Sequence, residues 1–122
     1  MSVDCIFCDR SKIKSKVVLF NNNVFMFEPL NPVVDGHVLF VPKVHVKDAS
    51  DNPLITAKVF KVASWYAKSK EQPFNLITSA GGEATQSVYH LHVHYVPRKE
   101  NDGLQLPWTG QAPPNNLKDK EE

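Results

Sequence analysis

One stretch of the chain, QSVYHLHVHYVPR at residues 86–98, places histidines at the alternate positions His90, His92 and His94. The residues between and beside them are apolar, and this alternation predicts a β-strand with one buried face. Three residues are expected to point into the core: Leu91, Val93 and Tyr95. The imidazoles would then line the opposite face, roughly 6.6 Å apart. A row of this kind favours metal binding, proton transfer or nucleophilic catalysis.

The pattern of apolar and turn-forming residues in the rest of the sequence predicts a small α+β domain. Four more strands are expected: Lys16–Phe20, Val24–Phe27, His37–Pro42 and Phe74–Thr78. A helix should begin near Asp51 or Asn52, either of which can cap it, with Pro53 at its first position. Its apolar residues repeat along one helical face: Ile55, Val59, Val62, Ala63 and Tyr66. Three strands, a helix and two strands indicate a largely antiparallel sheet with a short segment before it.

Length and composition fit one globular domain, which we place at residues 1–108. The chain has 122 residues, of which 42% are hydrophobic, and its formal net charge is +1. Residues 109–122 are rich in proline, asparagine and charge, so an extended or disordered tail is expected there. The low net charge argues against a large nucleic-acid surface. No apolar run approaches the ~20 residues that span a bilayer, and no signal core opens the chain, which favours the cytoplasm over a membrane.

Two cysteines, Cys5 and Cys8, form a C-x-x-C pair near the N-terminus. Such a pair is half of a zinc site, a redox pair, or two unrelated thiols. A redox pair of the thioredoxin type should follow a strand and open a helix, whereas this pair precedes every expected strand. Zinc is therefore favoured, although two thiolates supply only half of a tetrahedral ligand set.

The spacing of the three alternate histidines along the strand indicates that they do not all have the same role. On a straight strand His90 and His94 would lie roughly 13 Å apart, too far to share one metal ion. A neutral imidazole can also attack phosphorus near neutral pH, because its ordinary pKa is about 6.5. The central residue, His92, is the natural nucleophile, and Gln86, Ser87 and His94 are donors that could stabilise negative charge on a phosphoryl group. A hydrolase that uses the histidines as metal ligands is the alternative.

At this point the chain resembles the histidine-triad (HIT) superfamily of nucleotide hydrolases and transferases. Residues 86–98 resemble its signature, NPVVDGHVLFVPK at residues 31–43 resembles its second conserved block, and CIFC at residues 5–8 resembles the opening of many members. The resemblance covers roughly residues 4–108. It implies a HIT-like fold, a five-stranded antiparallel sheet with one main helix, and a homodimer.

The resemblance also implies a mechanism and a substrate class. His92 would attack the α-phosphorus of a purine nucleotide or nucleotide conjugate, and water or another acceptor would resolve the nucleotidyl-histidine intermediate. His94 would contact the phosphate and assist the leaving group, while His37 and His90 would support the geometry. Two residues would bind the α-phosphate oxygens: Gln86 and Ser87.

A structural zinc ion is the one cofactor that the resemblance implies. Some members hold zinc through the C-x-x-C pair, a histidine after the middle block and the first histidine of the triad. The matching residues are Cys5, Cys8, His45 and His90. Together they make a complete Cys₂His₂ set, and His90 would then orient the segment that carries His92.

Three positions depart from the family pattern. Pro29 stands where the family usually has the acidic or amide residue that holds the ribose, and the neighbouring Glu28 is the candidate substitute. Ser79 replaces a longer amide side chain before the turn, and Thr85 replaces a glycine before the signature. These departures motivate an alternative function, a HIT-fold module that binds a nucleotide or a protein with little or no turnover.

Overall fold

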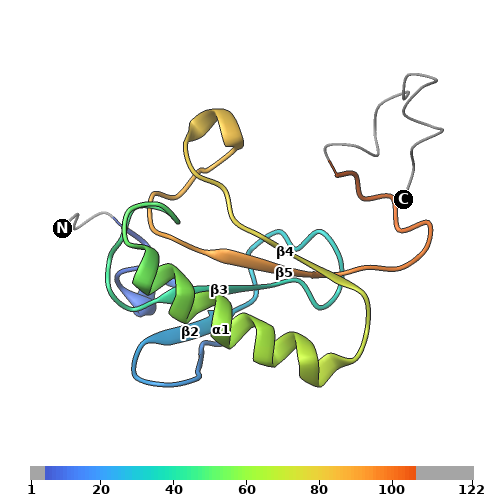
Figure 1. Ribbon diagram of the computed structural model, residues 1–122, viewed down its shortest axis with the longest axis horizontal. Coiled ribbons are helices and arrows are strands. Elements are labelled where there is room, and N and C mark those ends of the chain that lie inside the picture. The colour runs from blue at the N-terminus through green and yellow to red at the C-terminus, as the bar shows by residue number, and fades with distance from the viewer. Residues whose placement is uncertain (1–4, 107–122) are drawn as a thin grey trace.

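A five-stranded antiparallel sheet with one long helix across it forms the molecule (Figure 1). The computed structural model describes residues 5–106. The strands are β1 (Val18–Leu19), β2 (Val24–Phe27), β3 (Val38–Pro42), β4 (Phe74–Ile77) and β5 (Val93–Pro97), in the order β1-β2-β3-β5-β4. The α+β fold predicted from the sequence is therefore confirmed, whereas the tail expected at residues 109–122 lies outside the described residues.

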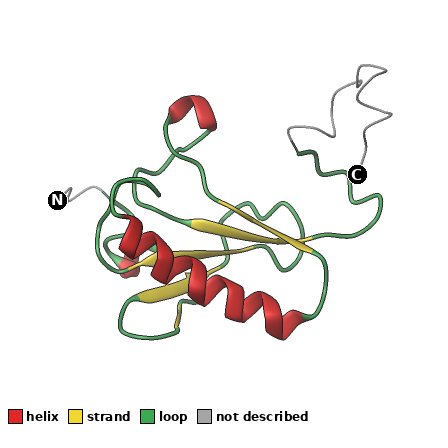
Figure 2. Ribbon diagram, viewed as in Figure 1, coloured by secondary structure: helices red, strands yellow, loops and turns green. Residues whose placement is uncertain are grey.

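The helix α1 (Pro53–Lys70) lies over one face of the sheet, as Figure 2 shows in red against the yellow strands. It begins where predicted, because the Asn52 side chain accepts hydrogen bonds from the backbone N–H groups of Leu54 and Ile55. It ends at Glu71, which takes a left-handed conformation. In the described part of the chain, no helix has both the length and the apolar character needed to cross a membrane.

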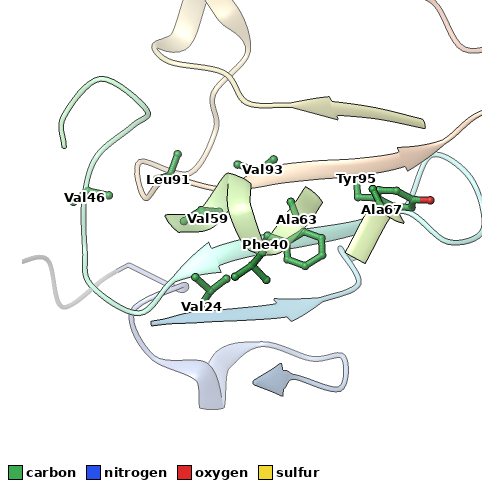
Figure 3. Close-up of a cluster of buried hydrophobic side chains, with 10 residues drawn as sticks. Val24, Phe40, Val46, Val59, Ala63, Ala67, Leu91, Val93 and Tyr95 are labelled. Carbon is green, nitrogen blue, oxygen red and sulfur yellow. The ribbon is translucent and has the colours of Figure 1, made fainter. Parts of the chain in front are cut away.

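The helix-facing side of the sheet carries the larger core. Figure 3 shows Leu91, Val93 and Tyr95 following one another along the β5 segment, with Val59 and Ala63 of α1 beside them. All five are buried. The apolar half of the histidine run therefore faces the core as its alternation predicts.

A second apolar cluster lies on the opposite face of the sheet, where the segment before β1 covers it. Its buried members are Phe7, Phe25, Phe27, Leu39 and Val41. A short 3-10 helix, η1 (Arg10–Lys12), follows Phe7 in that segment and is capped by Asp9. Phe7 of this segment also contacts the rings of His90 and His92.

The histidine strand is shorter than predicted, and this expectation was wrong at its start. β5 begins at Val93, so His90 and His92 lie in the extended segment before it. The ladder between β3 and β5 ends with the pair Phe40 and Val93, and the backbone N–H of Leu91 bonds instead to the carbonyl of Val46, 2.8 Å away. The segment therefore leaves the sheet where the loop after β3 crosses it.

The other strand ends differ by smaller amounts. The first predicted strand shrinks to the two residues of β1, and β3 and β4 are each one residue shorter than expected. A second 3-10 helix, η2 (Gly82–Ala84), occupies the Gly-containing loop between β4 and β5. Such terminal differences leave the sheet order unchanged.

Candidate active site and metal centre

All five histidines of the chain gather in two neighbouring clusters. One cluster holds His37, His92 and His94, and the other holds His45 and His90 together with the two cysteines. The pairing of β3 with β5 joins parts of the chain that lie far apart in sequence, because it sets Leu39 directly opposite His94. The sheet therefore brings His37, just before β3, close to the histidine run at residues 90–94.

The pair His37 and His94 has a direction of hydrogen bonding that the backbone sets. The N–H of Val33 donates to His37 Nδ1 at 3.1 Å, so His37 carries its ring proton on Nε2. That Nε2–H donates in turn to His94 Nδ1, 2.9 Å away. Neutral His94 is left with its proton on Nε2, and therefore presents a donor on its far side.

A glycine allows the loop before β3 to bring His37 to this position. Gly36 has a φ of 93°, in the region that favours glycine, and a Cβ there would lie 3.1 Å from the Pro97 side chain. The loop can therefore pass close to the end of β5. His37 itself is buried, and burial lowers its pKa, which keeps the ring neutral at physiological pH.

His92 has one nitrogen occupied and the other available. Its Nδ1–H donates to the carbonyl oxygen of His90 at 2.8 Å, so the neutral ring keeps an unprotonated Nε2. Burial lowers the pKa of His92, which favours this neutral form. The ring of Phe7 packs edge-on against it at 5.3 Å between centroids, and the His94 ring lies at the same distance. This arrangement presents a nucleophilic nitrogen next to a hydrogen-bond donor.

His94 stays neutral for the same physical reason. Burial lowers its pKa to about 4, and the neighbouring His92 and His37 rings add to the effect. At neutral pH the imidazoles of this cluster therefore act through single N–H groups and lone pairs rather than through full positive charges.

The second cluster has the geometry of a tetrahedral metal site. Ligand atoms of Cys5, Cys8, His45 and His90 all lie within 4.8 Å of one another. His90 Nδ1 is 3.4 Å from the Cys5 sulfur, 3.5 Å from the Cys8 sulfur and 3.2 Å from His45 Nδ1. A zinc ion with its usual bond lengths would give edges of roughly 3.3–3.8 Å between such ligands. The four side chains therefore lie close enough together to hold one metal ion.

His90 is oriented for that role by the end of β3. Its Nε2–H donates to the carbonyl oxygen of Pro42 at 2.8 Å, which leaves Nδ1 unprotonated and turned toward the cysteines. The ring is completely buried, and burial lowers its pKa to about 4. The Nδ1 atom of His90 therefore faces the two cysteines and His45.

The turn before the histidines is held by Gln86. Its side-chain oxygen accepts from the N–H of Gly81 at 2.7 Å, and its amide nitrogen donates to the carbonyls of Lys47 and Val88. The residue is buried, and both hydrogens of its side-chain amide are used inside the protein. Ser87 beside it is exposed and remains open to a ligand.

The other expected substrate-binding residues lie at the rim. Glu28 is exposed just after β2, where it follows Phe27, the partner of Leu39 on β3. Its negative charge partly opposes the lowering of the His37 pKa by burial. Ser79 is half-buried after β4. Thr85 adopts a φ of 72°, so the threonine that replaces a glycine still occupies a left-handed conformation.

Several residues that contact the site were not predicted from the sequence. The carbonyl of His92 accepts a hydrogen bond from the hydroxyl of Thr78 at 2.7 Å, which ties the His92 segment to the end of β4. Phe7, which packs on His92, stands between the two cysteines and could have been singled out by that position. The backbone groups of Val33 and Pro42 have no distinctive side chain and could not.

Comparison with known proteins shows which family this chain is similar to. The HIT domain model matches residues 10–101. An adenylylsulfatase of Arabidopsis thaliana is 30% identical over 117 residues, which are 89% of this chain and 58% of that protein. An adenosine 5'-monophosphoramidase of Saccharomyces cerevisiae is 31% identical over 112 residues, which are 88% of this chain and 71% of the yeast protein.

Solved structures agree with the sequence comparisons. A HIT family protein from Bacillus anthracis superposes with a TM-score of 0.77 at 33% identity, covering 88% of this chain and 83% of that one. A histidine triad protein from Clostridium difficile gives a TM-score of 0.73 at 32% identity, covering 86% and 99%. The antiparallel sheet and its paired histidines define a histidine-triad fold. The chain belongs to the HIT family, although it spans only 58% of the length of the Arabidopsis relative.

Proposed function

We propose that this protein is a nucleotide hydrolase or nucleotidyl transferase that acts at an α-phosphorus through a covalent intermediate on His92. The observation that carries the proposal is the hydrogen bond from His92 Nδ1–H to the carbonyl of His90, at 2.8 Å. It fixes the tautomer and leaves Nε2 with a free electron pair. An imidazole held in this way is an activated nucleophile that needs no separate base.

The proposed reaction has two displacements at phosphorus. In the first, the Nε2 electron pair of His92 forms a bond to the α-phosphorus while the bond to the leaving group breaks, and the leaving group keeps that electron pair. In the second, the oxygen of water or another acceptor hydroxyl attacks the phosphorus and its proton is released, while the bond to Nε2 breaks. His92 then regains its original neutral state.

The neighbouring residues have complementary proposed roles. The Nε2–H of His94, backed by His37, donates to a phosphoryl oxygen and toward the leaving group. Ser87 offers its hydroxyl to the same phosphate, and Gln86 positions the turn that carries Ser87. Two rim residues are proposed to contact the nucleoside: Glu28 and Ser79.

Zinc is the proposed metal for the second cluster, with Cys5, Cys8, His45 and His90 as its ligands. Two sulfur and two imidazole ligands form a closed structural set, with no position left for substrate. A metal held there would fix the N-terminal segment, and with it Phe7, against His92. The proposed role of the ion is structural, because it would link the N-terminal segment to the rest of the domain.

A homodimer is proposed through the outer edge of β4. Within residues 5–106 this edge has no strand beside it, and Phe74 and Ile77 on β4 are 40% and 37% exposed. An edge strand with exposed apolar side chains is suited to pairing with a second copy.

One observation favours the alternative of a binding module. Gln86 reaches a phosphate only by giving up a bond to Lys47 or Val88, and Pro29 offers no side-chain donor or acceptor to a ribose. In that case the protein would hold a nucleotide without turning it over. The two functions are separated by measuring binding and turnover on the same preparation.

The test compares wild type with His92→Asn. The two relatives described above make adenosine phosphoramidate and adenosine 5'-phosphosulfate the first substrates to use. Loss of the nucleophile should lower kcat by at least ~10³-fold, while adenosine nucleotide binding and the melting temperature change little. Equal turnover by both proteins would exclude His92 as the nucleophile, and binding without wild-type turnover would favour the binding module.

A further inference from the structure

A cavity of about 430 Å³ lies outside the histidine cluster, beside the metal centre. Its walls come from the N-terminal segment through Cys5 and Ile6, from the loop after β3 through His45 and Lys47, and from the turn before β5 through Ser87 and Tyr89. Cavities of this size accept small-molecule groups. The reaction proposed above assigns it no occupant.

The polar groups around the cavity suit an anion. Lys47 supplies an ammonium group, while Ser87 and Tyr89 supply hydroxyl donors, and no carboxylate lines the cavity among the described residues. The single ion pair between described side chains joins Arg98 and Asp102, so Lys47 is not held in one. Asp51 bonds to the backbone N–H of Lys47 rather than to its ammonium group.

The position of the cavity indicates which part of a substrate it receives. Ser87, the proposed ligand of the α-phosphate, forms part of its wall. Glu28, the proposed ribose contact, instead follows Phe27, which pairs with Leu39 on β3, and no residue between β2 and β3 lines the cavity. The two substituents of the α-phosphorus would therefore extend in different directions, one past Glu28 and the other past Ser87.

We propose that this cavity receives the leaving group, and that Lys47 selects for leaving groups that depart as sulfate or phosphate anions. The inference rests on the function proposed above. When the bond between the α-phosphorus and the bridging oxygen breaks, the oxygen keeps the electron pair and its negative charge. The Lys47 ammonium group stabilises that developing negative charge. An amine leaving group takes up a proton and departs without negative charge, so Lys47 does not stabilise its departure.

The experiment uses two substrates that share the adenosine and the α-phosphorus. Adenosine 5'-phosphosulfate releases sulfate, and adenosine phosphoramidate releases ammonia. In Lys47→Gln, kcat/KM for the phosphosulfate should fall about 10-fold, while kcat/KM for the phosphoramidate stays within about twofold. Lys47→Arg keeps the positive charge, so the ratio of kcat/KM for the phosphosulfate to kcat/KM for the phosphoramidate should stay as in wild type. The matched control is Lys58→Gln, which removes an exposed lysine on α1. Higher ionic strength screens the Lys47 charge, so it should reduce the ratio of kcat/KM for the phosphosulfate to kcat/KM for the phosphoramidate in wild type.

Each other outcome has a distinct meaning. If Lys47→Gln lowers turnover of both substrates equally, or of neither, the leaving-group assignment is wrong while the nucleotide chemistry on His92 stands. If wild type turns over neither substrate, the proposed function itself fails, and this inference fails with it.

Discussion

For three of the five imidazoles in this site, a backbone group decides which nitrogen is available. The carbonyl of His90 takes the Nδ1 proton of His92, the carbonyl of Pro42 takes the Nε2 proton of His90, and the N–H of Val33 occupies Nδ1 of His37. Alternation of histidines in the sequence predicts neighbours, but it cannot predict these bonds, because any residue supplies the same backbone atoms. The tautomers follow from the fold.

The half-buried His94 ring makes stability depend on pH. Its pKa falls from an ordinary 6.5 to about 4 on folding, so the unfolded chain binds the proton more readily. The stabilisation is fully present above pH 6.5 and is lost as the pH falls from 6.5 toward 4. Urea unfolding across this range should show a steeper loss for wild type than for His94→Gln, which cannot titrate. Parallel losses would contradict the assignment.

The backbone of Thr85 is strained by its left-handed conformation. A β-branched residue at a φ of 72° is costly, and glycine adopts that conformation freely. Thr85→Gly should raise the free energy of unfolding by about 0.5–1 kcal/mol after the entropy of the unfolded glycine is subtracted. Thr85→Ala, which keeps a Cβ in the same conformation, should gain less. A loss of stability in Thr85→Gly would show that the threonine side chain compensates for its backbone.

At the scale of elements, the segment before β1 has little regular structure of its own. It is held by Phe7 in the second apolar cluster and by Cys5 and Cys8 against the histidines. The C-x-x-C spacing indicated half of a metal site, and the family resemblance supplied the other half. The structure brings all four ligands together, which spacing alone could not establish for residues up to 85 positions apart.

Removal of one ligand should therefore loosen this element. In Cys5→Ser we expect loss of bound zinc, measured by elemental analysis, and a melting temperature lower by about 5 °C or more, because metal binding is coupled to folding. A chelator should lower the wild-type melting temperature in the same way and leave Cys5→Ser unchanged. Asp9→Ser, which keeps a capping oxygen in the same segment, is the control. Full zinc content in Cys5→Ser would contradict the assigned centre.

The histidine run itself shows what periodicity can and cannot predict. The inward positions Leu91, Val93 and Tyr95 are all buried as expected. The start of the strand was wrong because the loop after β3 supplies the carbonyl of Val46 to Leu91 and draws the segment out of the sheet. Periodicity depends on the pleat, which continues in extended backbone, whereas strand ends depend on partners from distant sequence.

At the scale of the whole molecule, the sheet order puts the two histidine-bearing blocks on adjacent strands. β3 and β5 are neighbours although the helix and β4 separate them in the chain. The succession of elements predicted the fold class and the antiparallel pairing. It did not predict that the N-terminal segment covers the histidine face, since that contact depends on Phe7 and on the metal ligands together.

The free edge of β4 leads to a prediction about assembly. Ile77→Asp places a charge on the exposed edge and should convert a dimer into a monomer of 13.8 kDa, measured by light scattering. Leu19→Asp, an exposed substitution on the opposite edge strand β1, should leave the dimer intact. The same mass for Ile77→Asp and wild type would exclude this edge as the interface.

The covalent step on His92 is tested most directly by intact mass. Wild type is mixed briefly with adenosine phosphoramidate, quenched without strong acid and weighed, in parallel with His92→Asn. We predict that wild type gains the mass of one adenylyl group, that acid removes it, and that His92→Asn gains none. Steady turnover by wild type with no adduct at any quench time, or an adduct of equal amount on His92→Asn, would contradict the account.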